Sequence, residues 1–83
     1  MFKLLISSKA SKKLKLLKKS HQDAILSAFE EIKEDPLIGK PLTRELTGRF
    51  SYRVGVYRVI YKINQKDQII QVLSAGHRAH VYR

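Results

Sequence analysis

The run from Arg49 to Lys62, RFSYRVGVYRVIYK, most constrains how this chain can fold. Apolar and polar residues alternate on both sides of Gly55, which is the pattern of two β-strands joined by a tight turn. A turn at Val54-Gly55 would place Tyr52 opposite Tyr57. The hairpin then has one aromatic and aliphatic face and one cationic face. The cationic face is predicted to carry Arg49, Ser51, Arg53, Arg58, Ile60 and Lys62.

Two helices are predicted ahead of this hairpin. The first begins at a cap provided by Ser7 or Ser8, and the second begins at Ser20 with capping-box spacing. The second helix ends before Pro36, because the residue preceding a proline is pushed out of the α region. Residues 36–48 are predicted to form a linker. Its expected core anchors are Leu37, Ile38, Leu42 and Leu46.

Further strands complete the predicted sheet. Residues 2–7 read as an opening strand, residues 68–75 as a third strand after the hairpin, and residues 80–83 as a short edge strand. In this arrangement Tyr61 faces Ile70. We therefore predict an α+β domain with the order β-α-α-β-β-β over residues 1–83, with a helical hairpin packed on one face of a small, twisted, mostly antiparallel sheet.

Composition limits the classes of function. The chain has 83 residues and no cysteine, which indicates one domain with neither a disulfide framework nor a thiolate metal site. No segment approaches the roughly 20 apolar residues of a membrane span, so we expect a cytoplasmic protein without membrane partners. Seventeen basic residues against seven acidic ones give a net charge of +10, which attracts polyanions of several kinds.

The basic residues gather in two places. Residues 1–20 hold seven lysines and no acid, whereas residues 21–35 hold five acids and one lysine. The lysines fit either a solvated helix face or a contact to nucleic-acid backbone. On the sheet, arginine forks match phosphate oxygens, so a phosphate-binding surface is predicted. Its residues are Arg49, Arg53, Arg58 and Lys62, with Arg78 and Arg83 at its end.

Groups that can move a proton lie near the C-terminus. His77, His80 and Tyr82 flank Arg78, and a neutral imidazole can accept a proton from a ribose hydroxyl. The histidines lack a carboxylate or cysteine at metal-ligand spacing, so neither a metal site nor a cofactor is expected.

The segments LTGRFSYRVGVYRVIYKI and IIQVLSAGHRAHVYR, which follow a helical hairpin and a linker, resemble the RelE/ParE superfamily of toxins from toxin–antitoxin pairs. The resemblance covers essentially the whole chain. It implies a small toxin neutralised by a cognate acidic antitoxin, in an assembly such as a heterotetramer. In the RelE branch it implies an endoribonuclease that cleaves mRNA in the ribosomal A site, through attack of a ribose 2′-hydroxyl on the adjacent phosphate.

The resemblance also assigns residues. It implies phosphate-handling roles for Arg58 and Arg78, and a catalytic role for Tyr82. Arg53 matches the first of two strand lysines of the RelE pattern, and the shortened hairpin leaves no counterpart for the second. Arginine stays charged and is a poor proton carrier. His77 is therefore the candidate for the general base, and Tyr82 is the alternative.

Three functions stay open at this point. The first is the RelE-type mRNA endoribonuclease, for which mRNA and the ribosome are partners. The second is a ParE-type toxin that poisons DNA gyrase. The third is a non-catalytic RNA-binding relative.

Overall fold

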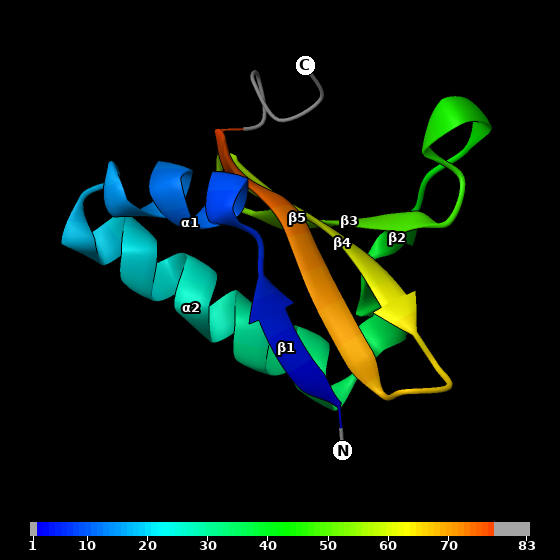
Figure 1. Ribbon diagram of the computed structural model, residues 1–83. Helices are drawn as coiled ribbons and strands as arrows, with labels where there is room; N and C mark the ends of the chain where they lie inside the picture. Colours follow the sequence, from blue (N-terminus) through cyan, green and yellow to red (C-terminus); the bar gives the residue numbers. More distant parts are fainter. Residues whose placement is uncertain (1, 78–83) are drawn as a thin grey trace.

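A computed structural model describes residues 2–77 (Figure 1). Two helices pack on one face of a five-stranded sheet with the order β1-β5-β4-β3-β2. Strand β1 runs parallel to β5, and the other neighbours are antiparallel. The elements are β1 Lys3–Ile6, α1 Ser8–Lys15, α2 Lys19–Glu34, η1 Pro36–Ile38, β2 Lys40–Pro41, η2 Arg44–Leu46, β3 Arg49–Val54, β4 Tyr57–Asn64 and β5 Ile69–His77.

This architecture confirms the predicted α+β class and the helices on one face of a mostly antiparallel sheet. The predicted element order lacked one strand. Residues 36–48 were expected to be a linker, but Lys40 and Pro41 pair with β3 and form a short fifth strand at the sheet edge. The predicted edge strand at residues 80–83 lies outside the described residues.

The helix starts follow from local hydrogen bonds. Ser7, one of the two predicted candidates, caps α1, and its Oγ accepts a bond of 3.1 Å from the Ala10 amide. The predicted start of α2 at Ser20 is wrong, because the helix begins at Lys19 after an N-cap residue without a side-chain cap. Instead, the Gln22 side-chain amide donates to the Leu17 carbonyl at 2.9 Å and closes the corner between the helices.

The hydrophobic core lies between the helices and one face of the sheet. Residues of β4 and β5 alternate into it, and α2 contributes every third or fourth residue, as a one-sided helix should. The fully or nearly fully buried members are Ala10, Ile25, Phe29, Ile32, Val59, Tyr61, Ile70, Val72 and Ala75.

The β3–β4 hairpin turns at Gly55-Val56, with Val54 opposite Tyr57. The predicted pairing of Tyr52 with Tyr57 is therefore wrong by two residues. Gly55 has φ +59°, a conformation that glycine adopts without steric cost and that suits the first position of a two-residue hairpin loop. Because the shift is even, each side chain keeps its predicted face.

The β4–β5 pairing contains a β-bulge. Tyr61 pairs with Val72 and Ile60 pairs with Ser74, so Leu73 is an extra residue in β5. The prediction that Tyr61 faces Ile70 is wrong. A bulge reverses the alternation of side chains beyond it.

The hydroxyl of Ser7 stabilises this bulge. It donates to the Leu73 carbonyl at 3.0 Å while also capping α1. Beyond the bulge, Ala75 points into the core, Gly76 lies opposite Arg58, and β5 continues to His77 rather than ending near Ala75.

The segment after α2 is held by one buried tyrosine. The Tyr61 hydroxyl donates to the Pro36 carbonyl at 2.7 Å and accepts a bond of 3.0 Å from the Gly39 amide. Two of the predicted anchors, Leu37 and Ile38, are instead 62% and 41% exposed. Leu37 and Ile38 therefore do not anchor this segment to the core, and the bonds of the Tyr61 hydroxyl do.

Candidate phosphate-binding site

The sheet face opposite the helices carries the predicted cations. Arg53 lies directly opposite Arg58, and Arg49 lies opposite Lys62 on the same face. Ser51, opposite Ile60, lies between these two pairs. We call this set, together with Lys40 of β2, the cationic face.

Lys40 is the member that the sequence pattern did not predict. It pairs with Ser51 in the β2–β3 ladder and therefore points to the cationic face. It stands between Gly39 and Pro41, and glycine and proline are depleted in strands. Only the edge pairing shows that this lysine belongs to the site, and no periodicity in the sequence indicates it.

A pocket of about 270 Å³ opens on the cationic face. Among the described residues, its lining includes no carboxylate. The lining residues are Lys40, Leu42, Ser51, Arg53 and Arg58.

The chemistry of this pocket suits a phosphate group. Arg58 is half-buried with its Nε shielded from solvent, whereas Lys40 and Arg53 are exposed at the rim. Like charges on directly opposed strand residues are destabilising, so the arrangement of Arg53 and Arg58 favours an anion between them. The Ser51 side chain adds a hydroxyl that can donate to or accept from a ligand.

Two predicted site residues lie on the cationic face outside the pocket. Arg49 and Lys62 share the cationic face but do not line the pocket. Arg78, Tyr82 and Arg83 lie outside the described residues, so their roles remain predictions.

His77 lies on the other side of the sheet from the pocket. It pairs with Tyr57, and the two rings are 6.1 Å apart in an edge-to-face arrangement. The Tyr57 hydroxyl in turn bonds to His21 Nδ1 at 2.6 Å on the helix-covered side. The structure does not bring His77 together with Arg58, because the bulge reverses the alternation of β5 between Ser74 and His77.

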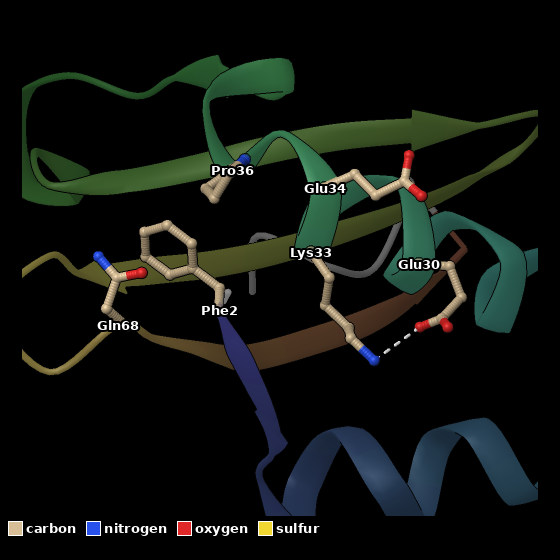
Figure 2. A pocket seen from close by; sticks show the side chains of 6 residues that line it. All are labelled: Phe2, Glu30, Lys33, Glu34, Pro36 and Gln68. Atoms are coloured by element: carbon tan, nitrogen blue, oxygen red, sulfur yellow. Dashed lines mark ion pairs between the residues drawn. The ribbon is translucent and has the colours of Figure 1, made fainter.

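A larger pocket of about 500 Å³ lies at the end of α2, away from the cationic face. Figure 2 shows its lining residues, among which Lys33 and Glu30 form an ion pair of 3.0 Å. Phe2 and Pro36 supply apolar surface, and the charged groups are of both signs. This pocket lacks the one-sided positive charge that attracts a phosphate.

Residues 2–77 contain no group of three or more His, Asp or Glu side chains placed to hold a metal ion. No helix in this part of the chain is long and apolar enough to cross a membrane.

Comparisons with known proteins identify the family to which the chain belongs. Residues 4–82 match the family described as the ParE toxin of type II toxin–antitoxin system, parDE. The chain is 46% identical over 57 residues to toxin RelG of Mycobacterium tuberculosis, a match that covers 68% of this chain and just under two thirds, 66%, of that protein.

Solved structures show the same fold. A chain of the toxin–antitoxin complex RelBE2 from Mycobacterium tuberculosis superimposes with a TM-score of 0.86 and 34% identity, over 93% of this chain and 98% of that one. A chain of the archaeal RelE–RelB complex from Pyrococcus horikoshii gives a TM-score of 0.78 and 28% identity, over 96% and 98%. The protein therefore belongs to the RelE/ParE superfamily of toxins of type II toxin–antitoxin systems.

Proposed function

We propose that this toxin is an endoribonuclease that cleaves mRNA in the ribosomal A site, in the cytoplasm, and that it holds the RNA phosphate in the pocket of the cationic face. The observation that supports the proposal most is the lining of that pocket. Lys40, Arg53 and Arg58 converge there from three adjacent strands, with no carboxylate among the described lining residues.

The proposed reaction needs positioning and charge more than protein nucleophiles. The ribose 2′-oxygen forms a bond to the adjacent phosphorus, and the bond from phosphorus to the 5′-oxygen breaks, which leaves a cyclic phosphate and a 5′-hydroxyl. Arg58 and Arg53 stabilise the negative charge that grows on the phosphate oxygens. Lys40 adds charge at the pocket rim.

A proton must leave the 2′-hydroxyl and another must reach the 5′-oxygen. His77 lies across the sheet from Arg58, so we assign the role of general base, which takes the proton of the 2′-hydroxyl, to Tyr82 instead, and the 5′-oxygen takes its proton from water. Arg78 is assigned to the phosphate and Arg83 to the RNA backbone. The assignments of Tyr82 and Arg78 rest on the matching motif, and that of Arg83 rests on its place in the basic cluster predicted from the sequence, because residues 78–83 are not described.

An acidic antitoxin is the proposed partner that silences the site. The related toxins from Mycobacterium tuberculosis and Pyrococcus horikoshii are found in toxin–antitoxin complexes. An acidic segment laid on the cationic face would neutralise Arg49, Arg53 and Lys62 and exclude RNA. Such binding should weaken as salt rises.

Inhibition of DNA gyrase is the second candidate function. It is favoured by the match to the ParE family over residues 4–82 and by the short Gly55-Val56 turn, which leaves no place for a second strand lysine.

Primer extension on ribosome-bound mRNA separates the candidates. The purified toxin should produce discrete cuts, and Arg58→Ala and Arg78→Ala should each lower the cleavage rate by about 10–100-fold, since a hydrogen bond to a charged group is worth about 1.5–3 kcal/mol. Lys66→Met, in the β4–β5 turn, is the matched charge control and should cut at the parent rate. Intact mRNA together with cleaved DNA trapped on gyrase would overturn the nuclease proposal, and intact mRNA with retained RNA binding would indicate a non-catalytic relative.

The same assay tests the proton assignment. Tyr82→Phe should abolish most cleavage while leaving RNA affinity nearly unchanged. His77→Ala should cleave at the parent rate. A large loss of cleavage rate in His77→Ala, with the stability of the protein unchanged, would show that His77 takes part in the reaction.

A further inference from the structure

The helix-covered side of the sheet and the pocket on its other side are connected through residues 36–40. Tyr61 is fully buried, and its hydroxyl lies within hydrogen-bond distance of both Pro36 and Gly39. The residue that follows Gly39 is Lys40, which crosses to the edge of the sheet and lines the pocket. The core residue Tyr61 therefore contacts the residue that directly precedes Lys40 of the pocket.

The fit between Tyr61 and Gly39 leaves no room for adjustment. Gly39 is buried, and a Cβ atom there would lie 2.5 Å from the Tyr61 hydroxyl oxygen and 3.1 Å from two ring carbons. Contacts below 3.0 Å force something to move. The backbone at Gly39 is thus fixed both by a hydrogen bond and by close approach.

By contrast, β2 itself holds Lys40 weakly. The strand is only two residues long, and Pro41 has no amide hydrogen to donate to the ladder. On its far side, the Leu42 amide donates to the Arg49 carbonyl at 2.9 Å. The register of β2 therefore depends on what holds the chain before Lys40.

We propose that Tyr61 is a positioning residue for the phosphate pocket. Its hydroxyl fixes Gly39, which sets Lys40 opposite Ser51 and keeps the lysine ammonium on the cationic face. Tyr61 acts from the opposite side of the sheet and does not touch the ligand. The proposal rests on the proposed function of the pocket in binding RNA phosphate.

The first test needs no ligand. Tyr61→Phe removes the hydroxyl and keeps the ring, and hydrogen exchange by NMR then reports on the Leu42 amide, which marks the pairing of β2 with β3. Exchange at Leu42 should accelerate at least tenfold relative to core amides of β4 and β5. Tyr52→Phe is the matched control, because Tyr52 lies on the same side of the sheet but bonds to Glu31 and not to residues 36–39. Unchanged Leu42 exchange in Tyr61→Phe would overturn the proposal.

The second test measures binding of a labelled single-stranded RNA 12-mer as a function of salt. Loss of one phosphate contact lowers the slope of log K against log salt by about 0.7. Lys40→Met and Tyr61→Phe should each lower the slope by that amount, although Tyr61→Phe changes no charge. The double variant should match Lys40→Met alone. A parent slope in Tyr61→Phe, or additive losses in the double variant, would overturn the proposal.

The two tests separate the possible failures. A parent protein that binds no RNA would refute the proposed function of the pocket, while the Leu42 exchange would still decide whether Tyr61 positions β2. If Tyr61→Phe does not fold, Gly39→Ala perturbs the same contact from the linker side and should accelerate Leu42 exchange in the same way.

Discussion

The helix-covered face of the sheet and the cationic face differ in the way their polar groups are arranged. On the helix-covered face, the Tyr61 hydroxyl has two backbone partners and the Tyr52 hydroxyl donates to the Glu31 carboxylate. On the cationic face, Arg53 and Arg58 are placed opposite each other around a pocket whose described lining holds no acid.

This difference separates stability from binding. A buried polar group with its partners in place stabilises the fold, because leaving it unsatisfied costs about 1–3 kcal/mol. Like charges on opposed strand residues cost stability in the free protein and become favourable when an anion arrives. Changes on the two faces should therefore have opposite effects on the free energy of unfolding.

The largest expected effect comes from Tyr61→Ala, which removes a buried ring from the core on the helix-covered face. Tyr61 is fully buried and stacks on Phe50 with ring centroids 5.5 Å apart. We expect the free energy of unfolding to fall by about 3–5 kcal/mol, as for other buried aromatic truncations. Urea denaturation would measure it, and a loss below about 1 kcal/mol would show that the core does not depend on this ring.

A smaller loss is expected for Ser7→Ala, which removes the helix cap and the bond to the bulge together. Its Oγ accepts a hydrogen bond from the Ala10 amide and donates one to the Leu73 carbonyl. We expect a destabilisation of about 1–2 kcal/mol. Ser8→Ala, at the first helical position, is the control and should change thermal unfolding little. Equal melting temperatures for both variants would contradict the dual role of Ser7.

Arg53→Gln should act in the opposite direction on stability. Removing one of two opposed positive charges should raise the free energy of unfolding by about 0.2–1 kcal/mol at low salt. The gain should shrink at high salt, because Arg53 is exposed and screened. RNA affinity should fall in the same protein. A variant that loses both stability and binding would refute the contrast between the faces.

Alkaline pH should affect the helix-covered face. The bond from Tyr52 to Glu31 raises the pKa of Tyr52 above its usual value of 10.0, and burial raises the pKa of Tyr61 likewise. The folded protein therefore holds these protons more tightly than the unfolded chain does. Their contribution to stability is complete below about pH 10 and is lost as pH rises through the raised values.

Denaturation at pH 9 and pH 11 would measure this dependence. The decrease in the free energy of unfolding between the two values should be smaller in Tyr52→Phe than in the parent protein, because the variant has one raised hydroxyl fewer. An equal decrease in both proteins would contradict the assignment for Tyr52.

The sequence predicted the parts of the fold that depend on periodicity. Alternation around Gly55 placed Arg53 and Arg58 on one face, and that assignment holds even though the hairpin register differs by two residues. The cap at Ser7 and the stop before Pro36 were predicted because each depends on one or two neighbouring residues.

The sequence did not predict features that depend on contacts between distant segments. Lys40 joins the site through pairing with Ser51, eleven positions away, and through the bond between Gly39 and Tyr61. The bulge at Leu73 likewise has no local signature, because a leucine at the extra position looks like any residue of a regular apolar strand. It nonetheless decides that His77 lies away from Arg58.

The bulge has a consequence for how such toxins can diverge. Deletion of the single codon for Leu73 would remove the extra residue and restore regular alternation in β5, while Ile60 would still lie opposite Ser74 and His77 opposite Tyr57. Insertion of one codon at this position into an unbulged relative, taken up as a bulge, would likewise keep the side chains beyond it on their faces. A change in length by one residue is thus absorbed locally, so gene insertions and deletions at this position leave the side chains at the end of the strand where they were.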